Sequence, residues 1–379
     1  MYSQEYQEIV KLFHDRMSFT ETKRVPHLSG FYTWKIHDSE FSFKEALYDD
    51  KKMEKLVCDF HHRYNFDGYF DLGTRNPMRL VDSMGPGSIY IFNEYNDSFN
   101  VVDKVMMDET GYDAFADDPI KAVRAMIKTK YPNATAKNLL NGMNELINFG
   151  RFSGKMAQTF AEKFSRPSVF SMTGAIMMPA EFFSSTTRGI KNYALDMRRC
   201  PEAVTRAQDT YFKHYNKPAI EKNLASDTSV YITDCYTALL AYATMNVKQF
   251  EKFYWPYLKE YIDTTIDHNK RMYIYTESTM LRFTDFFNDY PKGYIVIHPE
   301  EDSVFTLKEK MPNICISGGM STITLGTGSP EQAVEEAKTL IDGMGPGFIL
   351  SQDKMVSFKN DCKRENLLAV CNFVREYEI

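Results

Sequence analysis

Short apolar runs alternate with longer amphipathic stretches along most of this chain. The runs are rich in β-branched and aromatic residues and end in Gly, Asp, Glu or His, a pattern typical of buried strands that lead into loops. The stretches between them carry apolar residues at helical spacing, as in 44–64. This order, in which a strand is followed by a helix and the pair repeats, favours an α/β fold with a parallel sheet.

About eight strand-and-helix units are predicted, which indicates a (β/α)8 TIM barrel with N-terminal additions. We expect one domain over 1–379, with an N-terminal helix at 4–17 and an excursion at about 84–113, where short alternating runs suggest a hairpin. The predicted strands are 24–30, 66–73, 168–174, 228–234, 271–277, 293–298, 313–319 and 345–351.

The unit at 271–298 carries the clearest candidate chemistry. Its first strand is predicted to end at Glu277, and its second strand is predicted to end at His298. Asp234 closes another predicted strand. Active sites of parallel barrels lie at the carboxyl ends of the strands, so these three side chains are expected to meet at one mouth. The alternative is that Glu277 and His298 only pair with each other.

Composition narrows the function classes. The 379 residues are 43% hydrophobic and 25% charged, as in ordinary globular proteins, and the net charge is −6. An acidic chain is a poor candidate for nucleic-acid binding. No apolar run approaches the ~20 residues that span a bilayer. The six cysteines form no CxxC pair, and the first residues do not resemble a signal peptide, so we expect a cytoplasmic protein.

Several segments together resemble the uroporphyrinogen decarboxylase superfamily. The closest likeness is in the tail, at Cys315–Glu331, Gly345–Ser351 and Glu365–Ala369. Three other segments fit the same pattern. They are the beginnings of two predicted strands, Arg24–Pro26 and Phe66–Gly68, and the helix segment Pro256–Lys259. The resemblance covers nearly the whole chain and implies the barrel fold.

The decarboxylases of this superfamily share an Arg-Gln-Ala-Gly-Arg segment after the first strand, whose arginines bind substrate carboxylates. The corresponding segment here, Leu28–Trp34, contains no arginine. A pocket without these guanidinium groups is poorly suited to a polyanionic substrate. Decarboxylation, or another lyase reaction on a carboxylate, is therefore the alternative function.

The other branch contains corrinoid-dependent methyltransferases. Members that act on coenzyme M bind zinc through a His-x-Cys pair, and that pair falls here on Tyr275 and Glu277. The O-demethylases, which act on phenyl methyl ethers, are more similar, because their motif is Glu-x14-Glu-x20-His. Glu277 and His298 match its second half, while the upstream position holds Ile262. Asp234 is our candidate for the missing ligand.

The O-demethylase resemblance implies an activity, a metal and a partner. Zinc held by Glu277, His298 and Asp234 would polarise the ether oxygen, and the methyl group would pass to the Co(I) corrinoid (cobalamin) of a separate corrinoid protein. The methyl donor would be a small methoxylated aromatic, with a different donor as an alternative. The ring is expected to contact Tyr275 and three residues after the first strand: Phe31, Tyr32 and Trp34. The sequence leaves open whether the protein forms a homodimer.

Overall fold

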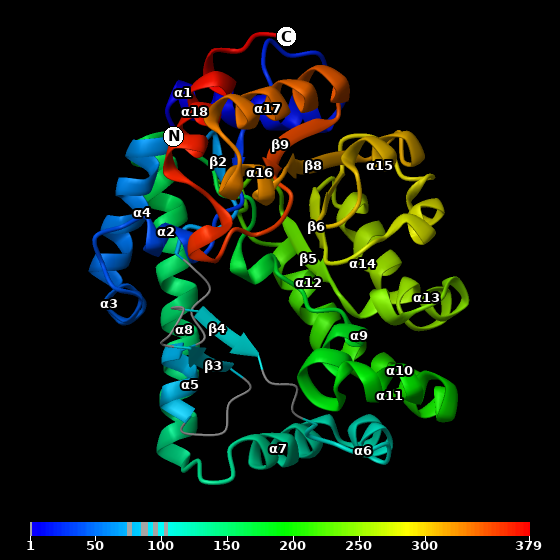
Figure 1. Cartoon of the computed structure of the whole chain (residues 1–379). Coiled ribbons are helices and arrows are strands. Elements are labelled where there is room, and N and C mark those ends of the chain that lie inside the picture. Colours follow the sequence, from blue (N-terminus) through cyan, green and yellow to red (C-terminus); the bar gives the residue numbers. More distant parts are fainter. Residues whose placement is uncertain (1, 74–77, 85–89, 94–97, 102–104) are drawn as a thin grey trace.

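A parallel sheet forms the centre of the molecule (Figure 1). The computed structural model describes residues 2–73, 78–84, 90–93, 98–101 and 105–379. Five hydrogen-bonded strands lie in sequence order, with nearly all their residues buried, as expected for a parallel sheet covered on both faces. They are β5 Cys235–Leu239, β6 Met272–Thr276, β7 Ile295–Pro299, β8 Cys315–Met320 and β9 Phe348–Gln352.

Two much shorter strands lie beside this sheet. β1 Leu28–Ser29 pairs in parallel with β2 Gly68–Tyr69. Isolated parallel bridges join His27 to Leu350, Tyr69 to Ser168, and Ser168 to Tyr231. The α/β class with parallel strands is therefore confirmed. Within the described residues, however, the continuous sheet has five strands where a closed eight-stranded barrel was predicted, because the N-terminal half contributes only two-residue strands and single bridges.

The helices follow the predicted order, with some differences in detail. The helical segment after β5 is broken at Tyr254, and the connection at 281–287 is a 3-10 helix. Two helices begin with clear caps: Asp118 caps the helix that begins at Pro119, and Ser329 forms a capping box with Gln332. The first helices are α1 Gln4–Met17, α2 Trp34–His37, α3 Phe43–Tyr48, α4 Asp50–Tyr64, α5 Met78–Met84, α6 Gly111–Asp117, α7 Pro119–Lys130, α8 Ala136–Thr159 and α9 Pro179–Glu181.

The second half of the chain supplies the remaining α-helices. The last of them was predicted at 364–377 and begins at Arg364 as expected. These helices are α10 Ile190–Arg199, α11 Pro201–Tyr211, α12 Lys217–Leu224, α13 Val247–Phe253, α14 Trp255–Asp267, α15 Val304–Lys310, α16 Thr322–Thr327, α17 Pro330–Met344 and α18 Arg364–Glu376. None of the helices that the structure describes has the length and apolar character needed to cross a membrane.

Helix α1 covers the amino ends of the strands. The Arg16 carbonyl accepts a hydrogen bond of 3.0 Å from the backbone of Gly347, just before β9. The His14 ring lies 3.0 Å from the Ile232 carbonyl, just before β5. Phe13 and Met17 are fully buried in the same apolar cluster as the inward residues of the strands. The carboxyl ends are thus the side of the sheet that α1 leaves uncovered.

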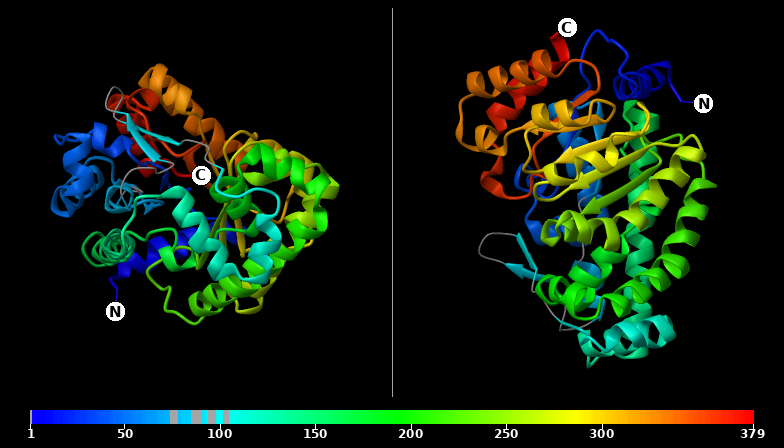
Figure 2. Two further views of the ribbon diagram at one scale, coloured as in Figure 1. Left: turned by 90° about the horizontal axis from the view of Figure 1, so that it is seen from below. Right: turned by 90° about the vertical axis from the view of Figure 1, so that its right-hand side faces the viewer.

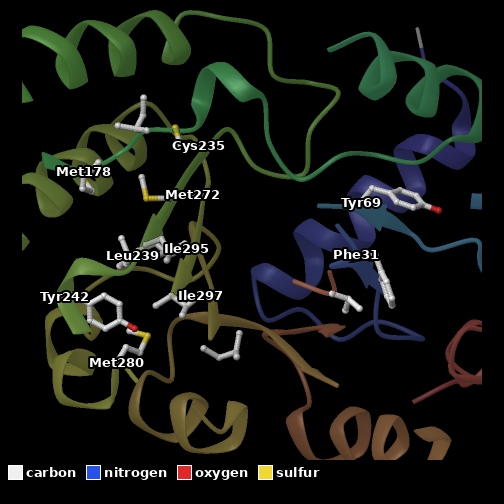
Figure 3. Packing of buried hydrophobic residues seen from close by; sticks show 14 of the residues in the cluster. Phe31, Tyr69, Met178, Cys235, Leu239, Tyr242, Met272, Met280, Ile295 and Ile297 are labelled. Carbon is white, nitrogen blue, oxygen red and sulfur yellow. The ribbon is translucent and has the colours of Figure 1, made fainter. Parts of the chain in front are cut away.

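The outward side chains of the strands pack against helices and loops. Figure 3 shows Cys235, Leu239, Met272, Ile295 and Ile297 facing a layer that contains Met178, Tyr242 and Met280. All of these residues are buried. The inward side chains form a second cluster that is dominated by aromatic rings.

The predicted excursion contains a hairpin. β3 Tyr90–Asn93 pairs antiparallel with β4 Ser98–Val101; the rest of the expected 84–113 segment lies partly outside the described residues. Both termini lie at one end of the molecule, and α6 and α7 lie at the other end (Figure 1; Figure 2, right). The single-domain organisation stays a prediction.

Candidate active site

His298 lies at the centre of a buried polar network at the carboxyl end of the sheet. It is fully buried in β7, beside Tyr275 of β6. Its Nδ1 lies 2.7 Å from the Tyr273 hydroxyl, which is also 3.0 Å from Ser317 Oγ. Its Nε2 lies 2.8 Å from the Gln352 carbonyl. The network therefore joins β6, β7, β8 and β9.

The protonation of His298 follows from its partners. A carbonyl oxygen only accepts, so Nε2 must carry the proton that it donates to Gln352. Nδ1 then accepts from the Tyr273 hydroxyl. Burial lowers the pKa of His298 to about 4, so the ring is neutral at pH 7. Both nitrogens are occupied by hydrogen bonds in this state.

Tyr275 connects the network to the mouth. Its ring centroid lies 5.0 Å from that of His298. Its hydroxyl donates to Glu300 Oε1 at 2.7 Å and accepts from the Met355 backbone at 3.3 Å. Burial, followed by the nearby Glu300 carboxylate, raises the pKa of Tyr275 well above its ordinary value. Tyr275 is therefore a neutral hydrogen-bonding group.

Asp353 directly follows β9, and among the acids at this end of the sheet it has the clearest pKa shift. Burial raises its pKa to about 6, although its Oδ1 accepts a hydrogen bond from the Thr322 backbone at 3.2 Å. A carboxyl group with this pKa is partly protonated near neutral pH and can transfer a proton to a ligand.

Two buried polar atoms near β9 have no hydrogen-bond partner within the described part of the chain: Ser351 Oγ and Gln352 Nε2. Both residues are fully buried. The Gln352 amide oxygen is occupied, because it accepts from the Gly30 backbone at 2.7 Å. An unpaired buried polar atom costs about 1–3 kcal/mol, which binding of a water molecule or a ligand would offset.

Aromatic side chains line a hollow at the same end of the sheet, after β2. Tyr32 and Phe70 have ring centroids 5.9 Å apart, and Phe70 contacts Phe170 at 5.2 Å. The hollow also includes Phe152 of α8 and Met172. The lining is aromatic and apolar, but its volume is about 20 Å³, so an aromatic ring would enter it only after these side chains move apart.

An ion pair lies at the edge of this hollow. The Lys35 ammonium, which has no exposed surface, lies 2.9 Å from Asp71 Oδ2 and also donates to the Asp71 carbonyl. Burial lowers the pKa of Lys35, and Asp71 partly offsets this. The Lys35 ammonium is therefore paired with the Asp71 carboxylate.

Asp234 lies at the opposite end of the sheet from the other two predicted ligands. β5 begins one residue after Asp234, and Cys235 pairs with Met272 at the start of β6. Glu277 follows the end of β6. The Asp234 carboxylate accepts from the Thr228 hydroxyl and, at 2.7 Å, from the Arg271 backbone. The expected strand at 228–234 was placed too early, so we remove Asp234 from the site.

Phe31 and Trp34 also lie elsewhere. Both are buried in the core behind β1, where the Phe31 ring centroid is 5.2 Å from that of Trp34 and 5.5 Å from that of Phe60. This placement corrects their expected role in lining the substrate pocket. Tyr32 and Tyr275 do lie at the mouth.

The predicted zinc ligands do not fit a shared metal ion. The Nδ1 lone pair of His298 is taken by Tyr273, and its Nε2 donates to Gln352. Asp234 is at the other end of the sheet. Over the described ranges, no three His, Cys, Asp or Glu side chains are arranged to hold a metal. Glu277 and His298 do share the carboxyl end.

Sequence reasoning missed several groups at this end. Ser351, Gln352 and Asp353 follow one another at the end of β9, and Glu300 follows β7. Their signal was their position after predicted strands, which also identified Glu277. Tyr273 was not among the predicted site residues, although its hydroxyl is the donor to His298.

Comparison with known proteins agrees with the tail motifs. The family model described as Uroporphyrinogen decarboxylase (URO-D) matches residues 155–377. A solved structure, a methyltransferase from Methanosarcina mazei, has a TM-score of 0.64 at 16% identity, with 97% of this chain and 98% of that chain covered. At this identity the likeness shows a shared fold. No curated protein sequence matches. Because the family model covers more than half of the residues, the chain belongs to the uroporphyrinogen decarboxylase family.

Proposed function

We propose that this protein is a methyltransferase that moves the methyl group of a small methoxylated aromatic to the Co(I) corrinoid of a partner protein. The observation that carries the proposal is the carboxyl end of the sheet, which has an aromatic hollow after β2 and, at the end of β9, polar atoms without a partner among the described residues and an acid of raised pKa. The fold shared with the Methanosarcina mazei methyltransferase supports the transfer class.

We also propose that the short strands and bridges complete a (β/α)8 barrel. The parallel contacts run from β9 to the segment of β1, from β1 to β2, from β2 to Ser168, and from Ser168 to Tyr231 ahead of β5. Together with the five-stranded sheet these contacts form a ring of eight members. In such a barrel the mouth is the expected place for catalysis.

The charge at the strand ends disfavours a polycarboxylate substrate. Among the described residues within two positions after the carboxyl end of a strand, five are carboxylates and one is a lysine, Lys354; the carboxylates are Asp71, Glu277, Glu300, Glu301 and Asp353. The buried Lys35 already pairs with Asp71. An acidic mouth repels a polyanion and accepts a neutral aromatic ether. This argues against the alternative lyase function.

Side chains at the mouth can assist the departure of a poor leaving group, the phenolate. When the methyl carbon is attacked, the carbon–oxygen bond breaks and its electron pair stays on the ether oxygen. Asp353 supplies a proton to that oxygen, so that a phenol leaves in place of a phenolate. Tyr32, Phe70 and Phe170 hold the ring, and Ser351 and Gln352 offer hydrogen bonds to its polar substituents.

The test is a methyl-transfer assay with a reduced corrinoid protein and a panel of methoxylated aromatics, with methanol and methylamines as other donors. The expected result is release of a phenol together with the absorbance change of corrinoid methylation. If neither occurs with any donor, the methyltransferase proposal fails. If the protein instead releases carbon dioxide from an aromatic carboxylate, the lyase alternative replaces it.

A further inference from the structure

A second pocket lies at the amino end of the sheet. It has a volume of about 130 Å³ and is bounded by α1, α18 and the residues that precede β1 and β2. Its charged lining comes from segments far apart in the sequence: Glu5, Arg24, Asp67, Arg166 and Arg375, with His27 beside them.

Two of the three arginines are held by neighbouring acids. Arg24 forms two hydrogen bonds to Asp67, at 2.6 and 2.7 Å. Arg166 donates to Glu5 at 2.7 Å and to the Asn65 side chain at 3.1 Å. These pairs fix the positions of both guanidinium groups and balance two positive charges.

Arg375 is the positive charge in excess. It lies on α18 and is exposed, and its Nη2 donates to the Tyr64 carbonyl at 3.3 Å. No acidic side chain in the described part of the structure forms an ion pair with Arg375, within the 4.0 Å limit for such pairs. The pocket therefore carries a net charge of about +1, with free donors on Arg375.

His27 has a buried ring nitrogen without a partner among the described residues. Its side chain is 3% exposed, and its Nε2 forms no hydrogen bond with any described residue. Burial lowers the pKa of His27 to about 4, so the ring is neutral and one of its nitrogens carries a proton. A ligand that accepts a hydrogen bond would satisfy this group.

We propose that this pocket binds a phosphate-sized oxyanion. Arg375 donates to its oxygens, His27 donates in the tautomer in which Nε2 carries the ring proton, and the net charge of about +1 attracts the anion. The site goes beyond methyl transfer, since it lies at the end of the sheet that α1 covers, away from the mouth.

An anion in this pocket would connect the two ends of the chain. It would join α18, through Arg375, to the segment that leads into β1, through His27. Binding to the folded state alone raises stability according to the ligand concentration relative to Kd. The site would thus stabilise the closed arrangement of the first and last elements.

The experiment is calorimetric titration of the full-length protein with inorganic phosphate, against sodium chloride of the same ionic strength. Arg375→Gln is the main variant, because the residue is exposed and its loss leaves the core intact. Arg199→Gln, an exposed arginine on α10, is the matched control. His27→Asn, checked for folding by circular dichroism, tests the buried donor.

The expected result is saturable phosphate binding that Arg375→Gln and His27→Asn each weaken about tenfold or more and Arg199→Gln leaves unchanged. Binding of glycerol phosphate with similar affinity would identify the group as a phosphomonoester, and binding of inorganic phosphate alone would identify a free ion. No saturable heat beyond the chloride control, or an unchanged affinity in Arg375→Gln, overturns the proposal.

Discussion

The two ends of the sheet are built in different ways. At the amino end, α1 fills the opening with Phe13 and Met17, and the arginines Arg24 and Arg166 meet nearby acids. At the carboxyl end, a neutral histidine network lies below aromatic rings and acids, and the Ser351 hydroxyl has no partner among the residues that the structure describes. The amino end is organised for stability, with one pocket as an exception, whereas the carboxyl end retains polar groups that a ligand can use.

The largest difference between the ends is expected for activity. Asp353→Asn removes the proposed proton donor, and general acid catalysis contributes about 10²- to 10⁴-fold, so kcat/KM for methyl transfer should fall by about that factor. In the wild type, activity should decline as pH rises above about 6, where Asp353 loses its proton.

The matched control for this acid is Glu301→Gln, an exposed carboxylate near the same strand ends. Its activity and pH profile should resemble those of the wild type. Equal activity of Asp353→Asn and the wild type would remove Asp353 from the mechanism and leave the mouth without an identified acid.

The amino end should dominate stability. Phe13→Ala opens a cavity at a fully buried position and should lower the free energy of unfolding by about 3–5 kcal/mol, measured by urea denaturation. The control is Phe305→Ala on α15, where the ring is 41% exposed and the loss should be much smaller. Comparable losses would contradict the view of α1 as the element that closes this end.

The histidine network is expected to contribute less. Tyr273→Phe leaves His298 Nδ1 and Ser317 Oγ without their shared partner, which should cost about 1–3 kcal/mol of unfolding free energy. Tyr294→Phe removes an exposed hydroxyl that bonds to Asn269 and should have almost no effect. A stable Tyr273→Phe protein would mean that water replaces the missing hydroxyl.

The pH dependence of stability is the last comparison, and here the two ends should agree. Burial lowers the pKa of His298 and of His27 from 6.5 to about 4. Below pH 6.5 these two histidines bind protons in the unfolded chain but stay neutral in the folded protein. Their contribution to stability is therefore complete above pH 6.5 and is lost as pH falls toward 4.

The measurement is the unfolding free energy between pH 7 and pH 4.5. His298→Asn and His27→Asn should each make the loss of stability less steep, while exposed His62→Asn should not. If only one of the two buried variants changes the slope, the ring at the other end is solvated in solution.

The sequence was most informative where a predicted strand ends in a residue whose side chain is capable of catalysis or metal binding. The unit from β6 to β7 was located within two residues, and Glu277 and His298 were placed at the carboxyl end, because long apolar runs with clear breaks define parallel strands. The segment at 228–234 was misread, because β-branched residues there resemble a strand although the sheet pairing begins at Cys235. Because the strand was predicted to end at Asp234 but begins one residue after it, Asp234 was assigned to the wrong end of the sheet.

Other site features depend on tertiary packing that periodicity does not encode. Phe31 and Tyr32 are adjacent in sequence, yet Phe31 packs behind β1 and Tyr32 faces the mouth, because successive side chains of an extended segment point to opposite sides. The pKa shift of Asp353 comes from burial by distant segments. The carbonyl of Gln352 became visible as a partner of His298 only in the folded chain.

The contacts of α1 also constrain how the chain acquires its structure. Arg16 reaches the backbone of Phe348, 332 positions away, and its own carbonyl accepts from Gly347. During synthesis these partners emerge long after the first helix, so the end of the sheet that α1 covers cannot close until nearly the whole chain has been made. Such high contact order slows folding and exposes the apolar face of α1 to chaperones in the interval.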